Sequence, residues 1–110
     1  MKKRYTPNKK YIADPKSFDK LDAAIKEVVK HDDKLRFEFE EERLNLLIAG
    51  TVYQLRTAAG LTQKQLAERA GIPQTFISRI ENPESKKRTT LDTLAKVVHA
   101  FDKQIMIEIV

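Results

Sequence analysis

Three polar side chains, Gln74, Thr75 and Ser78, have the types and spacing to hydrogen-bond to the edges of DNA bases. A Gln side chain can pair bidentately with the exposed edge of adenine in a major groove. The two hydroxyls can add hydrogen bonds or contact a thymine methyl group. Because Ile77 and Ile80 fall on the opposite edge of the same predicted helix, the polar three face outward. The pattern predicts a helix that reads bases in the major groove.

Gln63 and Lys64 are predicted to contact phosphate. They lie at the start of the preceding predicted helix, where free backbone amides converge and the helix dipole favours an anion. Such contacts position a protein on the duplex without reading its sequence.

The elements that position these residues are two short helices joined by a glycine turn. Thr62 and Gln65 have the spacing of a capping box, so the first helix is predicted to start near Gln63. Gly71 suits the left-handed turn that ends it, and Pro73 is predicted to open the second helix. A helical hairpin with a merely solvated polar face is the alternative, but caps, turn and apolar positions agree better with a DNA-binding unit.

From Thr62 to Glu81 the chain resembles the Cro and phage-repressor (Xre-type) helix-turn-helix family, with its pattern T-Q-x-x-L-A-x-x-x-G-[IV]-x-Q-x-x-[IV]-S-x-[IL]-E. The resemblance implies that Gln63 contacts the DNA backbone and that Asn82 contacts a phosphate. The base-reading residues that it implies are Gln74, Thr75 and Ser78, with Arg79 suited to either task.

The loop after the second helix departs from that family. Members commonly have glycine after Glu-Asn, whereas this chain has Pro83 and then a longer basic loop over 84–89. The loop carries three candidates for contact with the DNA backbone, Lys86, Lys87 and Arg88. A basic run in a loop is also often only solvated, and both interpretations stay open.

The predicted fold is all-α, a five-helix lambda-repressor-like domain over residues 44–102. Helical spacing places two further sets of apolar residues inward, one before Gly60 and one after the cap Thr90. The first set is Leu44, Leu47, Ile48, Val52 and Leu55, and the second is Leu91, Leu94, Val98 and Phe101.

Residues 103–110 are predicted to form a β-strand, because Ile105, Ile107 and Ile109 alternate with Met106 and Glu108. A lone strand in a helical domain leaves backbone groups unpaired, so we expect it to pair with the same strand of a second copy. A tail folded back over the last helix is the alternative. A two-fold dimer would suit paired operator half-sites.

Residues 1–43 are predicted to form a basic arm and a helical extension. Residues 17–45 carry six basic and nine acidic side chains, a net charge of −3, in a chain whose total is +5. Either this segment packs on the DNA-binding domain with its acids solvated, or its apolar side chains bind a basic partner. The partner-binding candidates are Phe18, Leu21, Ile25, Val28, Leu35, Phe37 and Phe39.

This layout resembles the HigA-type antitoxins of bacterial type II toxin-antitoxin systems. The resemblance implies a repressor of its own operon that binds and blocks a small basic RelE-like (HigB-type) toxin, which cleaves messenger RNA. Two alternatives stay open. One is a stand-alone repressor, although the sequence shows no sensor pocket, and the other is a HipB-type antitoxin that pairs with a kinase-fold toxin.

Catalysis is not expected. His31 and His99 are better explained as residues at helix ends, and no Gly-rich phosphate loop or ligand-spaced His cluster occurs. We expect no cofactor and no metal. With no cysteine, signal peptide or membrane span in the sequence, a cytoplasmic location is expected.

Overall fold

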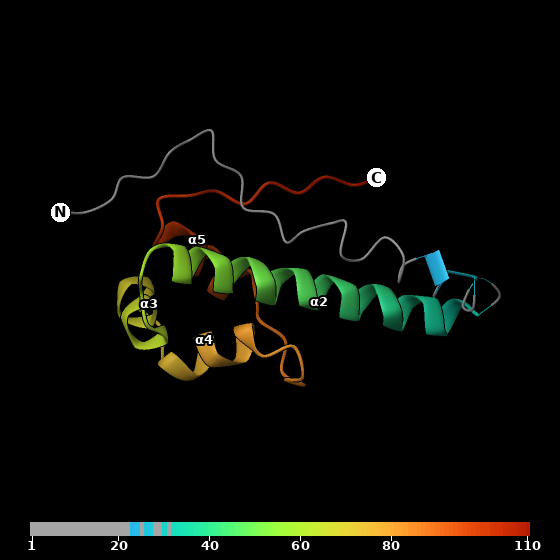
Figure 1. The fold of residues 1–110 in the computed structure, drawn as a ribbon, viewed down its shortest axis with the longest axis horizontal. Coiled ribbons are helices and arrows are strands. Elements are labelled where there is room, and N and C mark those ends of the chain that lie inside the picture. The colour runs from blue at the N-terminus through green and yellow to red at the C-terminus, as the bar shows by residue number, and fades with distance from the viewer. Residues whose placement is uncertain (1–22, 25, 28–29, 31) are drawn as a thin grey trace.

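The computed structural model describes residues 23–24, 26–27, 30 and 32–110. Its helices are labelled in Figure 1 from α2 onward, and α2 spans Asp33–Ala58. The helix-turn-helix pair is α3 (Gln63–Ala70) and α4 (Gln74–Glu81), and α5 (Leu91–His99) follows. The expected five-helix domain is not confirmed, because the described residues from 44 to 102 contain only α2 to α5, and the described part of the chain contains no strand.

The long helix α2 begins where Asp32 caps it, with the Leu35 amide donating to Asp32 Oδ1 at 3.0 Å. It therefore starts well before Leu44 and runs through the predicted boundary between the extension (1–43) and the domain (44–102). Most residues between Asp33 and Gly50 are good helix formers such as Leu, Lys, Arg and Glu, and no Gly or Pro interrupts them before Gly50. The helix ends just before Gly60, which has a left-handed φ of 70°.

The helix-turn-helix forms much as its sequence predicts. Gln65 N donates to Thr62 Oγ1 at 3.1 Å, and Thr62 N donates to Gln65 Oε1 at 2.9 Å, which confirms the capping box. Gly71 ends α3 with φ 70° and ψ 34°, a conformation that side chains resist. Pro73 is the N-cap of α4 rather than its first residue, because its ψ of 144° is extended and helical geometry begins at Gln74.

The core lies where α3 packs against α4 and α5, and α4 packs against α2 (Figure 1). The central residues are Val52, Leu66, Ala67, Ile77, Ile80 and Val97, all buried. Each large aliphatic side chain among them contributes about 1.5–3 kcal/mol by leaving water.

Two of the residues predicted to face inward are exposed. Leu91 is 78% exposed, because it lies about 120° around the axis of α5 from the buried Val97. Leu44 is 59% exposed, since it precedes the part of α2 that reaches the core at Ile48. The other predicted inward residues are buried or half-buried.

The loop between α4 and α5 forms no helix. Glu84 N donates to Asn82 Oδ1 at 3.0 Å, and Pro83 has no amide proton to donate to a helix. Thr90 then caps α5, with Thr93 N donating to its Oγ1 at 3.1 Å.

The predicted C-terminal strand is absent from the described residues. Residues 103–110 have no regular secondary structure, and Ile105, Ile107 and Ile109 are exposed. A strand exists only where a second strand takes its backbone hydrogen bonds, and the described part of a single copy offers none. Pairing of residues 103–110 with the same segment of a second copy stays a prediction.

Candidate nucleic-acid interface

The outer face of α4 carries the four predicted base-reading residues. Gln74, Thr75, Ser78 and Arg79 are all exposed. On the inner face Ile77 and Ile80 are buried against α2 and α3, so the helix is fixed in place while its polar face stays in solvent. A helix held in this way can enter a major groove without unpacking the domain.

Phe76 is a neighbour that the sequence interpretation missed. The Arg79 guanidinium carbon lies 5.8 Å from the centroid of the Phe76 ring, a cation-π distance. At an exposed site such a contact stabilises one position of the Arg79 side chain by about 0.5–1 kcal/mol. The spacing of three between an aromatic and an arginine on one helix was the available signal.

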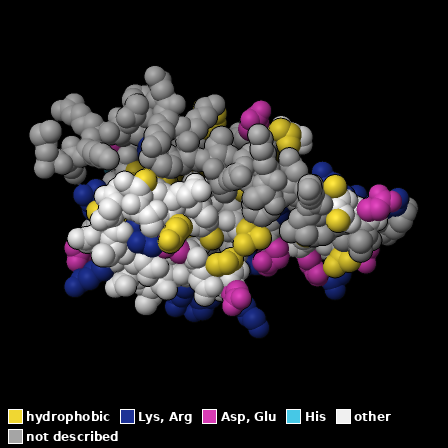
Figure 2. Space-filling model, viewed as in Figure 1, with side chains coloured by type: hydrophobic (Ala, Val, Ile, Leu, Met, Phe, Trp, Pro, Cys, Tyr) yellow, Lys and Arg dark blue, Asp and Glu magenta, His cyan; other side chains and the backbone are white. Residues whose placement is uncertain are grey.

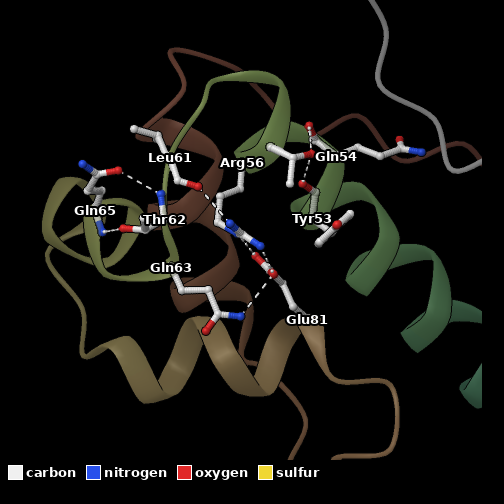
Figure 3. Close-up of polar contacts among 9 residues, drawn as sticks. Tyr53, Gln54, Arg56, Leu61, Thr62, Gln63, Gln65 and Glu81 are labelled. Carbon is white, nitrogen blue, oxygen red and sulfur yellow. Dashed lines mark hydrogen bonds and ion pairs between the residues drawn. The ribbon is translucent and has the colours of Figure 1, made fainter.

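A largely buried ion pair fixes the end of α4 to the end of α2 (Figure 3). Arg56 Nε and Nη2 donate to the two carboxylate oxygens of Glu81 at 2.7 and 2.9 Å. Arg56 Nη1 donates to the Leu61 carbonyl at 2.8 Å, so the same side chain also holds the loop before α3. The side chains are only 14% and 5% exposed. Hydrogen bonding to Glu81 raises the pKa of Arg56 above its ordinary value, so the guanidinium stays charged.

Gln63, a predicted phosphate contact, joins this network. Its Nε2 donates to Glu81 Oε1 at 3.3 Å, and Figure 3 shows its side chain directed toward α4. An amide nitrogen carries two protons, so Glu81 takes one and leaves the other to donate to a phosphate. The contact orients Gln63 at the N-terminus of α3, and the neighbouring Lys64 is exposed there.

The remaining phosphate candidates lie after α4. The Asn82 side chain accepts the Glu84 amide through Oδ1, which leaves its Nδ2 as a donor. Lys86 and Lys87 are exposed. Arg88 is held by α2 instead, with Nε 3.4 Å from Glu41 Oε1 and Nη2 2.5 Å from Glu42 Oε1.

The basic and acidic side chains lie on different parts of the surface. In Figure 2 most Lys and Arg side chains project along the left and lower edges, over α3, α4 and the loop after α4. Asp and Glu side chains gather along the lower side of α2. A basic edge on both sides of α4 suits a duplex whose phosphates flank the groove.

The partner-binding candidates are only partly described. Leu35 and Phe37 are exposed on the first turns of α2, and Phe39 is half-buried. The other four, Phe18, Leu21, Ile25 and Val28, lie outside the described residues.

The described residues contain no group of three or more His, Cys, Asp or Glu side chains that could hold a metal ion. None of the described helices has the length and apolar character needed to cross a membrane.

Two packed helices with a left-handed glycine between them, an exposed polar face and flanking cations define a helix-turn-helix DNA-binding fold. A family model described as Helix-turn-helix matches residues 52–106. This match spans half of the 110 residues, and the chain belongs to that family, in its Xre/Cro-type form. It carries the domain of a DNA-binding transcription regulator. No curated protein and no solved structure matches the chain.

Proposed function

We propose that the chain is an antitoxin and transcriptional repressor. It binds operator DNA as a homodimer through α4, and it neutralises a small basic RelE-like (HigB-type) toxin that cleaves messenger RNA. In this proposal the chain binds its partners and catalyses nothing.

The toxin-binding part of this proposal rests on the exposed surface at the start of α2. We call residues 33–44 the α2 arm. The arm lies outside the matched part of the chain and projects past α4 in Figure 1. Phe37 and Leu44 are 68% and 59% exposed, and their spacing of seven residues puts them on one side of the helix. Exposed Glu38 and Glu40 flank them. Apolar anchors among acids suit a basic protein partner better than nucleic acid.

The test is capture of partners from the native host by the tagged full-length chain, compared with a Phe37→Ala/Leu44→Ala variant. Substitution is preferable to removing residues 1–44, because that truncation would cut α2 in the middle. Leu91→Ala is the matched control, since Leu91 is an even more exposed apolar side chain, at 78%, but lies on α5. We expect wild type and control to capture a small basic protein whose RNA cleavage is blocked in the complex, and the double variant to lose it.

Other outcomes would contradict the proposal. A kinase-sized partner would favour a HipB-type antitoxin. The absence of any partner, with DNA binding intact, would leave a stand-alone repressor.

One observation favours a stand-alone repressor as the second candidate. A pocket of about 150 Å³ lies between α4 and α5, with Phe76 and Ile80 on its apolar side and Arg79, Lys87 and Arg88 among its lining residues. A small amphipathic anion bound there would touch the base-reading helix directly, which is how a sensing repressor responds to a ligand.

A further inference from the structure

Arg88 lies between two groups of charges. On one side it pairs with Glu41 and Glu42 of α2, and its Nη1 donates to the Ser85 carbonyl at 2.8 Å. All three guanidinium nitrogens are therefore engaged within the protein. On the other side it lines a pocket together with Arg79 and Lys87, both of which belong to the predicted DNA surface.

Arg79, Lys87 and Arg88 line one pocket, so together they would attract an anion placed among them. The residues that line the pocket include no acid. The carboxylates of Glu41 and Glu42 lie on α2, outside the pocket lining, and pair with Arg88. A DNA phosphate beside Lys87 would compete with those carboxylates for the same guanidinium, since both anions accept bidentate arginine hydrogen bonds.

The ion pairs are exposed enough to exchange. The side chains are 35% exposed for Arg88, 48% for Glu41 and 56% for Glu42, and such pairs are held weakly in water. The loop need not leave α2 when they break, because Asn45 Nδ2 also donates to the Pro83 carbonyl at 3.1 Å. Arg88 can thus turn toward DNA while the start of the loop stays in place.

We propose that Glu41 and Glu42 withhold Arg88 from the DNA backbone, and that a cationic partner that binds these two carboxylates strengthens DNA binding by releasing Arg88. This inference rests on the proposed DNA-binding function, and it links the α2 arm to the loop after α4. Partner binding and DNA binding then favour each other. The two carboxylates oppose DNA binding while they hold Arg88, and they stop doing so when a cationic partner binds them.

The test measures affinity for DNA with Glu41→Gln/Glu42→Gln, a variant that imitates neutralisation by a cationic partner. The probes are a labelled duplex selected by the wild-type chain from a random-sequence pool and a scrambled duplex of the same length. The matched control is Glu38→Gln/Glu40→Gln, which removes the same charge from the same helix. Neither Glu38 nor Glu40 pairs with a cation among the described residues.

We expect the Glu41/Glu42 variant to bind both duplexes at least about threefold more tightly than the control does, with a salt slope steeper by about 0.9 because one more phosphate is neutralised. Adding Arg88→Gln should abolish this gain, whereas Arg88→Gln alone should change affinity little. Thermal unfolding would confirm that each variant is folded.

Equal affinities of the two double variants would overturn the inference, as would a gain that survives Arg88→Gln. If the wild-type chain and every variant bound neither duplex, DNA binding itself would be wrong and the inference would fail with it. The first two results leave the proposed function intact, so the two failures are distinguishable.

Discussion

Replacing Arg56 by alanine is expected to lower the free energy of unfolding by about 3–5 kcal/mol, because it leaves the Glu81 carboxylate buried without its counter-ion. The same change removes the hydrogen bond to the Leu61 carbonyl, so the loop before α3 also loses a contact. A small domain has a total stability of about 5–15 kcal/mol, and a loss of this size is a large part of it. Urea unfolding of the variant and the wild type measures the difference.

Arg36→Ala is the matched control. Arg36 lies on the same helix and pairs with Asp33 at 2.5 Å, but both side chains are more than half exposed. Such a pair contributes less than about 1 kcal/mol. Equal losses in the free energy of unfolding for the two variants would contradict the prediction that burial makes the Arg56–Glu81 pair the more stabilising one.

Removing residues 104–110 is expected to convert a dimer into a folded monomer. Binding to a palindromic operator should weaken by about 10²–10⁴-fold, because two separate monomers, instead of one dimer, would have to bind the two half-sites. The tail exposes Met106 and three isoleucines, which a second copy could cover by pairing backbone groups. Cutting after Lys103 preserves the turn that ends α5, where Lys103 N donates to the Val98 carbonyl at 3.3 Å.

Sedimentation gives the oligomeric state, and titration of a selected palindromic duplex gives the affinity. Ile107→Pro is a milder version, because proline removes one amide donor and disfavours pairing without shortening the chain. Glu108→Gln, next to it, should leave the dimer intact. A dimer that persists without residues 104–110 would place the interface elsewhere.

The parts of the fold that the sequence predicted depend on local chemistry. The capping box at Thr62, the glycine turn at Gly71 and the cap at Thr90 involve hydrogen bonds or backbone angles set within a few residues. Their positions could be predicted from spacing alone. The outward face of α4 could be predicted for the same reason, because Ile77 and Ile80 fix its inner edge.

The parts that were missed depend on partners distant in the sequence. The Arg56–Glu81 pair joins residues 25 apart, and the contacts of Arg88 with Glu41 and Glu42 span more than 40. Opposite charges in the runs at 40–42 and 86–88 were the available signal for the second contact. The strand at 103–110 was predicted from its alternating pattern, although that pattern forms a strand only if another chain segment pairs with it.

Base reading by α4 is the central claim, and the most direct measurement compares Gln74→Ala with Lys64→Ala on a selected duplex and on a scrambled one. Gln74→Ala is expected to weaken binding to the selected duplex by about 1–3 kcal/mol and to relax the choice of base at one step, with little effect on the scrambled duplex. Lys64→Ala should weaken binding to both duplexes alike, since a phosphate contact carries no sequence information. Equal losses on both duplexes for Gln74→Ala would contradict the assignment of α4 as the base-reading helix.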